Sequence, residues 1–293
     1  MTNPLITASA TVPTTQGTAA VYDRIGIGYS SVRRPDPRWA AVIRAALGDA
    51  RTVLNVGAGS GAYEPTDVTL LSVEPSQEMR AQRPAGSAPC VAASAEHLPF
   101  DDQSFDAAMA VLTVHHWSDL KAGLAELQRV AARFAIVTYD MDVQENFWFT
   151  RDYVPEIAAA ERSRVPSMER LTELLGPCEV IELPVWHDFT DGFMTAFWRR
   201  PTAYLDPATR RACSAFALTS QSAVARGVAR LEEDLASGAW QRRYADLWDR
   251  DHIDAGFRLV TGVSPHAVAR ESGARESGAR ESSARESDAE GGA

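Results

Sequence analysis

The chain has 293 residues, a length that suits one large α/β domain or two small ones. Its formal net charge is −10, from 29 basic and 39 acidic side chains, and no local basic stripe stands out. A surface this acidic repels a phosphate backbone, so we expect neither nucleic acid nor an anionic membrane as a partner. No apolar run approaches the roughly 20 residues that a membrane span needs.

The two ends of the chain differ from its centre. Residues 1–18 are rich in Thr, Pro and Gly, and we expect a flexible N-terminus without the features of a signal peptide. Residues 266–293 carry a repeat of the type Ala-Arg-Glu-Ser-Gly, which has no large apolar residue to bury and is expected to be disordered. The three cysteines are widely spaced and fit reduced thiols in the cytoplasm. One folded domain, residues 19–265, remains between these ends.

In chain order, the predicted elements alternate between helix and strand. Asp36 and Pro37 begin a helix that ends before Gly48. Ser76 and Ser118 are expected to cap two further helices. Apolar, β-branched runs predict strands at residues 52–56, 69–73, 90–92, 105–114 and 134–138. Continuous apolar strands that alternate with helices are typical of a parallel sheet covered on both faces, whose ligands bind beyond the carboxyl ends of the strands.

The second half of the chain adds a helix, two strands and two insertions. Residues 168–175 predict a core helix, residues 179–187 a sixth strand and residues 254–260 the last strand. The insertions, about 140–165 and 190–252, are rich in aromatic residues, and we expect them to form a helical lid over the strand tips. An aromatic lid favours a flat, apolar or aromatic substrate.

Residues 53–61 read VLNVGAGSG, a strand that runs into a glycine-rich turn. Glycines are needed where backbone takes positive φ or touches a ligand. Glu74 ends the next strand, where a carboxylate can accept hydrogen bonds from both hydroxyls of a ribose. The spacing of Gly57, Gly59 and Ala62 also fits a dinucleotide site, so an NAD-dependent oxidoreductase is an alternative. Against it, residues 62–68 leave little room for the helix that would hold a pyrophosphate.

Three segments, in this order, resemble class I S-adenosylmethionine-dependent methyltransferases of the methyltransferase-11 type: VLNVGAGSGAYEP, SVEPSQEM and ASAEHLPFDDQSFDAAMAVLTVHHW. The opening YDRIGIGYSSVRRPDPR is similar to a bacterial branch of natural-product enzymes, and the resemblance covers residues 20–263. The nearest characterised type that it suggests is the indole C3-methyltransferases of pyrroloindole alkaloid biosynthesis. The resemblance implies a Rossmann-like α/β fold with a seven-stranded, mostly parallel sheet, with S-adenosylmethionine as cofactor and S-adenosylhomocysteine as product.

The resemblance also implies roles for individual residues. The glycine turn would lie against the methionine part of the cofactor, Glu74 would hold the ribose, and Arg33 would pair with the cofactor carboxylate. Asn55 departs from the family, because many relatives have aspartate there. The implied cofactor-binding residues are Tyr29, Arg33, Gly57, Ala58, Gly59, Gly61, Glu74, Pro75, Met79, Ser94, Ala95, Leu112 and Thr113.

These observations predict methyl transfer to a small, aromatic molecule of secondary metabolism by a monomer or homodimer. C-methylation of an indole is one candidate, and O- or N-methylation of another natural product is the alternative. Displacement at a sulfonium needs no metal, so the enzyme mainly aligns the reactants, and a general base helps where the acceptor carries a proton. The candidate catalytic residues are His116, Glu64 and Tyr29. Packing at a strand end is the ordinary alternative for His116, and a cofactor or helix-cap contact is the alternative for Glu64.

Overall fold

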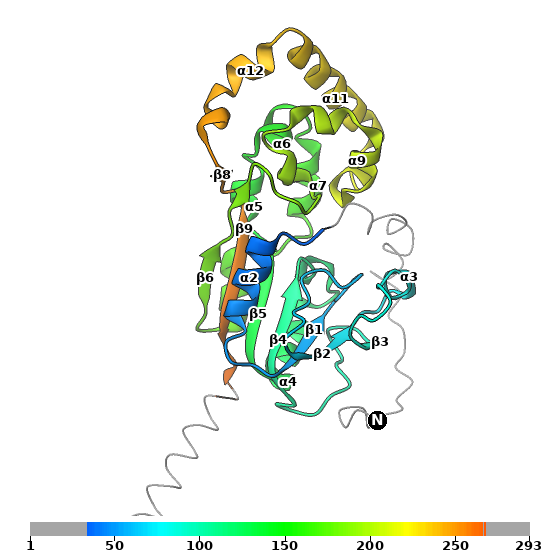
Figure 1. Cartoon of the computed structure of the whole chain (residues 1–293), viewed down its shortest axis with the longest axis vertical. Helices are drawn as coiled ribbons and strands as arrows, with labels where there is room; N and C mark the ends of the chain where they lie inside the picture. Colours follow the sequence, from blue (N-terminus) through cyan, green and yellow to red (C-terminus); the bar gives the residue numbers. More distant parts are fainter. Residues whose placement is uncertain (1–33, 266, 268–293) are drawn as a thin grey trace, which may run out of the picture.

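Seven strands form the central sheet of the computed structural model, which describes residues 34–265 and 267 (Figure 1). Their order is β3-β2-β1-β4-β5-β9-β6. Strands β1 to β5 pair in parallel, whereas β9 runs antiparallel to both β5 and β6. The strands are β1 (Thr52–Val56), β2 (Thr69–Val73), β3 (Cys90–Val91), β4 (Phe105–Val111), β5 (Ala131–Tyr139), β6 (Glu179–Glu182) and β9 (Phe257–Val263). The expected seven-stranded, mostly parallel α/β sheet is confirmed.

Helices cover both faces of this sheet. Helix α2 (Pro37–Ala46) packs on one face, where Trp39 and Ile43 share a buried cluster with Val53 of β1. Helices α4 (Leu120–Val130) and α8 (Met168–Leu175) pack on the other face, in a cluster that includes Leu54. Neighbouring strand residues therefore point to opposite faces, and both faces bury apolar side chains, as a parallel sheet requires.

The caps and ends of the helices largely follow the sequence. The Asp36 side chain accepts a hydrogen bond from the Arg38 N–H, and Gly48, with φ of +64°, follows α2. Ser76 caps α3 (Gln77–Ala81) by accepting from the Met79 N–H. The prediction for Ser118 was wrong: Asp119 caps α4, because its carboxylate accepts from the Ala122 N–H.

Two predicted strands are shorter than expected. Strand β4 stops at Val111 because Leu112 takes φ of +53°, and a 3-10 turn, η2 (Val114–His116), follows. The predicted sixth strand is divided: β6 ends at Glu182, and Pro184 has no N–H to continue the ladder. The chain then forms β7 (Val185–Trp186), which pairs with β8 (His252–Ile253) in a separate two-stranded sheet.

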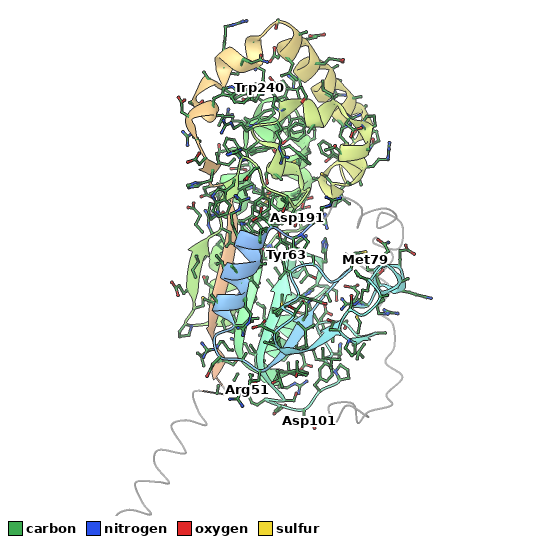
Figure 2. All side chains as sticks on the ribbon, viewed as in Figure 1. Arg51, Tyr63, Met79, Asp101, Asp191 and Trp240 are labelled. Atoms are coloured by element: carbon green, nitrogen blue, oxygen red, sulfur yellow. The ribbon has the colours of Figure 1, made fainter. Side chains whose placement is uncertain are left out.

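The remaining helices gather at one end of the sheet (Figure 1), and we call residues 141–162 and 194–249 the lid. Figure 2 shows that Arg51, before β1, lies at the far end, so the carboxyl ends of the parallel strands point toward the lid. The lid helices are α5 (Met141–Gln144), α6 (Trp148–Asp152), α7 (Glu156–Arg162), η3 (Met194–Phe197), η4 (Pro201–Leu205), α9 (Pro207–Arg211), α10 (Ser214–Ala217), α11 (Gln221–Ala236), α12 (Ala239–Arg243) and η5 (Ala245–Asp249).

Candidate active site

The glycine turn after β1 lies at this carboxyl edge. Gly57, Gly59 and Gly61 take φ of +69°, +54° and +93°, values that favour glycine. The N–H groups of Gly57 and Ala58 both donate to the Val73 carbonyl at the end of β2, at 2.8 and 3.0 Å. The turn is therefore held against the neighbouring strand by its own backbone.

Two side chains close on this turn. A Cβ added to Gly57 would lie 2.1 Å from Oγ1 of Thr113. Only glycine at position 57 therefore lets Thr113, just beyond β4, approach the turn this closely. Met79 is buried, and its Cε would lie 3.3 Å from a Cβ at Gly59. The structure thus brings Thr113, Met79 and the glycines into one cluster.

Glu74 lies at the end of β2, directly beside the turn. Its carboxylate accepts hydrogen bonds from the N–H of Gly59 at 2.8 Å and of Ser76 at 2.9 Å. Burial raises the pKa of this carboxyl, and the two backbone donors oppose that shift. Pro75 follows it half-buried, and Ser94 and Ala95 form a turn after β3, the strand that pairs with β2.

These residues fit an adenosyl sulfonium cofactor. The glycine turn leaves no Cβ between backbone and ligand, and each oxygen of Glu74 accepts one backbone hydrogen bond, which leaves further lone pairs for hydroxyl donors. Leu112 has positive φ at the tip of β4, the kind of strained backbone that collects at functional sites. Tyr29 and Arg33 lie outside the described residues.

Residues 57–68, between β1 and β2, contain no helix. The pyrophosphate-binding helix that a dinucleotide enzyme places there is therefore absent from this segment, as expected. The segment is instead fixed by Tyr63, which takes φ of +61° and whose hydroxyl donates to Asp191 Oδ2 at 2.9 Å. The same hydroxyl accepts from the Asp36 N–H at 3.3 Å, so one side chain joins the turn, α2 and the segment before η3 (Figure 2).

Glu64, a candidate base, is engaged in a buried ion pair. Both of its oxygens accept from the Arg83 guanidinium, at 2.9 and 2.8 Å, and Oε1 also accepts from Asn55 Nδ2 and Ser72 Oγ. A carboxylate paired this fully has its acceptor positions occupied by protein donors. These contacts favour a role in fixing the glycine turn to β2 over proton transfer.

His116, the other described candidate, is held neutral. Arg164 Nη2 lies 3.0 Å from His116 Nδ1, and because a guanidinium only donates, this nitrogen accepts and the ring proton lies on Nε2. Burial and the charge of Arg164 lower the pKa of His116 to about 3. Burial, then His116 and Arg164, lower the pKa of His115 well below its ordinary value. These surroundings favour hydrogen bonding over proton acceptance for the pair.

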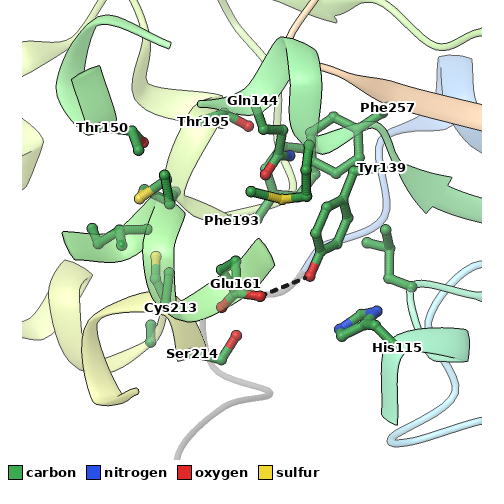
Figure 3. Close-up of a pocket in the computed structure, with 17 residues that line it drawn as sticks. His115, Tyr139, Gln144, Thr150, Glu161, Phe193, Thr195, Cys213, Ser214 and Phe257 are labelled. Carbon is green, nitrogen blue, oxygen red and sulfur yellow. Dashed lines mark hydrogen bonds between the residues drawn. The ribbon is translucent and has the colours of Figure 1, made fainter. Parts of the chain in front are cut away.

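A cavity of about 90 Å³ lies between the tips of β4, β5 and β9 and the lid (Figure 3). Its walls are mostly apolar. Four of its residues stand out for their chemistry: Tyr139 at the end of β5, Glu161 on α7, and the hydroxyls of Thr150 and Thr195. The lining residues are Leu112, His115, Tyr139, Met141, Gln144, Thr150, Ile157, Ala158, Glu161, Phe193, Met194, Thr195, Ala212, Cys213, Ser214, Ala215 and Phe257. We call this cavity the acceptor pocket.

Most lid aromatics do not face this pocket. Trp148 packs edge-on against Trp240 at 5.2 Å and Tyr204 at 5.5 Å, and Phe149 stacks on Tyr204 at 4.1 Å. These rings form a core inside the lid (Figure 2, near Trp240). The aromatic richness of the insertions therefore reflects the lid's own packing. The aromatic rings that line the pocket are Tyr139, Phe193 and Phe257, of which only Phe193 belongs to the predicted insertions.

Sequence reasoning placed His115 at this edge of the sheet but missed the polar pair of the pocket, Tyr139 and Glu161. Tyr139 Oη donates to Glu161 Oε2 at 3.2 Å, and Arg164 Nη1 lies 3.7 Å from Glu161 Oε1. The sequence signal for this site is weak. Glu161 lies in a largely apolar helix and is followed by Arg162 and Arg164, a pattern that many surface helices share. Among residues 34–265 and 267, no group of three potential metal-ligating side chains occurs. Within the same residues, no helix is both long and apolar enough to cross a bilayer.

The fold and the glycine–glutamate cleft are typical of class I methyltransferases, and comparisons with known proteins show the family. A family model for the methyltransferase domain matches residues 54–136. A crystal structure from Anabaena variabilis, described as a methyltransferase from an antibiotic biosynthesis pathway, is 30% identical with a TM-score of 0.73, and the match covers 79% of this chain and 99% of that one. The chain therefore belongs to the S-adenosylmethionine-dependent methyltransferases.

Two other solved structures share the fold alone. The (4+2)-cyclase SpnF is 16% identical, with a TM-score of 0.50 and coverage of 86% of this chain and 97% of that one. A phosphoethanolamine N-methyltransferase 2 from Haemonchus contortus is 14% identical, with a TM-score of 0.51 and coverage of 87% and 61%. A search of curated proteins gave no match. Because a cyclase shares this architecture, the acceptor must be argued from the pocket and not from the fold.

Proposed function

We propose that this methyltransferase acts on a small, mostly apolar or aromatic molecule of secondary metabolism, which binds in the acceptor pocket. The observation that carries the proposal is the position of that pocket. Leu112, the strained residue at the tip of β4, lines it, and Thr113, the next residue, packs on Gly57 of the glycine turn. One wall of the pocket thus adjoins the cleft that fits the sulfonium cofactor.

The chemistry of the walls supports a small acceptor with a ring. Phe193 and Phe257 lie 4.6 Å apart between ring centroids, and Tyr139 lies 6.0 Å from Phe257. Such rings favour offset or edge contacts with an aromatic guest. The description of the Anabaena relative as belonging to an antibiotic pathway supports a role in secondary metabolism. C-methylation of an indole is one candidate, and O- or N-methylation of another natural product is the alternative.

The cofactor would supply an activated methyl group, and the protein would supply alignment. We propose that the glycine turn with Ala58 and Thr113 holds the methionine part, and that Glu74 holds the ribose with Met79, Pro75, Ser94 and Ala95 around the adenine. Aligning the two reactants in a site without water can contribute on the order of 7–11 kcal/mol. Tyr29 and Arg33 remain predicted contributors from the N-terminal segment.

Calorimetry with S-adenosylmethionine and S-adenosylhomocysteine tests the proposal directly. We expect saturable binding of both, and no binding of NADH. A screen that follows S-adenosylhomocysteine release with indoles, phenols and amines then tests the acceptor class. If the cofactor binds and only long-chain or highly charged acceptors are methylated, the assignment of a small apolar acceptor is wrong. If neither cofactor form binds, the cleft is misassigned.

A further inference from the structure

Glu161 is the most distinctive polar group of the acceptor pocket. It lies on lid helix α7, its side chain is 9% exposed, and its carboxyl faces the cavity beside Tyr139 (Figure 3). Most acidic side chains at this depth are fully paired. Among residues 34–265, one oxygen accepts from Tyr139 Oη at 3.2 Å, and Arg164 Nη1 lies 3.7 Å from the other. These two neighbours therefore balance the negative charge of the Glu161 carboxylate only in part.

Two buried threonines line the same cavity but do not add to the evidence for a polar ligand. Thr150 on α6 and Thr195 on η3 are each 2% exposed, and both line the cavity. Within the described residues, neither Oγ1 has a hydrogen-bond partner. Each Oγ1 is itself covered by neighbouring atoms, so these two residues contribute to the wall of the pocket without presenting an oxygen to its interior.

We propose that Glu161 accepts a hydrogen bond, and then the proton, from an N–H or O–H group of the methyl acceptor. The inference rests on the proposed function, because it places the acceptor in this pocket. It narrows the acceptor class to flat, apolar molecules that carry one such donor. Permanently charged anions are excluded, since they would lie against an acidic group.

The groups that face Glu161 support this assignment over either histidine. Tyr139 from β5 and Arg164 from the turn after α7 contact it, and His115 from η2, Cys213 before α10 and Ser214 at the start of α10 line the same pocket. Arg164 is shared with His116, and its charge helps keep both imidazoles neutral. Burial raises the pKa of the Glu161 carboxyl, with Arg164 and Tyr139 opposing the shift. A carboxylate with a raised pKa is a stronger base than an exposed one.

The step balances without any further reactant. The acceptor atom, or the ring carbon conjugated to it, forms a bond to the methyl carbon, and the bond from that carbon to sulfur breaks. The electron pair of the broken bond stays on sulfur, which becomes neutral. The proton lost by the acceptor moves to the Glu161 carboxylate and is later released to water.

The test compares Glu161→Gln with Glu156→Gln. Glu156 begins the same helix, is exposed, and pairs with Arg226 at 3.1 Å, so it controls for removal of an acid from α7. Binding of indole, 1-methylindole, phenol and anisole is measured by calorimetry with S-adenosylhomocysteine present. We expect the wild type and the control to bind indole about tenfold more tightly than 1-methylindole, and phenol more tightly than anisole. We expect Glu161→Gln to lose most of that preference while its affinity for S-adenosylhomocysteine is unchanged.

Turnover of any probe that is methylated supplies a second readout. We expect kcat of Glu161→Gln to fall about 10²–10⁴-fold and its pH profile to lose the acidic limb that the wild type shows. Equal binding of donor and methylated probes by the wild type, absence of binding by all four probes, or an unchanged preference in Glu161→Gln would each overturn the assignment. If the wild type does not bind S-adenosylhomocysteine, the proposed function itself is wrong.

Discussion

The cofactor cleft and the acceptor pocket lie at the same edge of the sheet but are built in different ways. The cleft is made of backbone and of residues close in sequence: a turn at residues 57–61, the acid at Glu74 and the tip of β4. The pocket draws its walls from β4, β5, β9 and five lid segments spread over residues 112–257. The cleft is thus fixed by short motifs shared by a whole class of enzymes, whereas the pocket is assembled by tertiary packing specific to this chain.

Removing a tryptophan from the lid core should have the largest effect on stability. Trp240 is fully buried against Trp148 and Tyr244, so Trp240→Ala should lower the free energy of unfolding by about 3–5 kcal/mol. Urea unfolding measures this. Trp248 is 45% exposed, and Trp248→Ala serves as the control, with a change expected below about 1 kcal/mol. Similar costs for both variants would show that the lid aromatics are not a packed core.

Adding a single methyl group to the glycine turn should disable the cofactor cleft. In Gly57→Ala the new Cβ would meet Thr113 Oγ1 at 2.1 Å, and positive φ adds about 1–2 kcal/mol, for a total near 3 kcal/mol. We expect S-adenosylmethionine affinity to fall about 100-fold by calorimetry. Gly86 has φ of +87° with nothing within 4 Å of an added Cβ, so Gly86→Ala isolates the backbone cost. Equal loss of affinity in both variants would refute the close-approach argument.

Neutralising Glu74 should weaken cofactor binding without unfolding the chain. Glu74→Gln replaces one acceptor by an amide that faces a backbone N–H, so we expect a loss of about 1.5–3 kcal/mol in S-adenosylmethionine binding. Since burial raises the pKa of Glu74, wild-type affinity should begin to fall at a higher pH than for an exposed glutamate. Glu78→Gln, on the adjacent helix, is the control. An unchanged affinity in Glu74→Gln would show that this acid does not hold the ribose.

The smallest predicted effect is that of replacing His116, and it appears in the pH dependence of stability. The pKa of His116 lies at about 3 in the fold against 6.5 ordinarily, so its neutral ring stabilises the fold above pH 6.5. This contribution is lost as pH falls from 6.5 toward 3, by about 1.4 kcal/mol per pH unit. Urea midpoints at pH 7.5 and 5.5 should therefore differ less in His116→Asn than in the wild type. The exposed His252→Asn controls for the substitution itself, and equal differences would contradict a buried neutral His116.

The sheet and the meeting of the glycine turn with Glu74 could be predicted from the sequence because their signals are local. Gly57 and Glu74 follow apolar strands, and parallel strands necessarily bring their ends together. Ser118 and Asp119 show the limit of local signals, since both are good caps and only tertiary contacts chose between them: Glu96 accepts from Ser118 instead. Glu161 and Tyr139 could not be paired from sequence, because the fold of the lid decides which side of α7 faces β5.

Leu112 and Tyr63 carry a consequence for protein engineering. Each holds a left-handed backbone conformation that glycine adopts at no steric cost, so replacing either with glycine removes that penalty. Glycine would, however, also remove the Leu112 side chain from the pocket wall and the buried Tyr63 ring that ties the turn to Asp191, and the packing lost at Tyr63 outweighs the strain relieved. A heat-resistant catalyst should therefore be sought at positions such as the exposed Val180, and the two contorted residues should be left as they are.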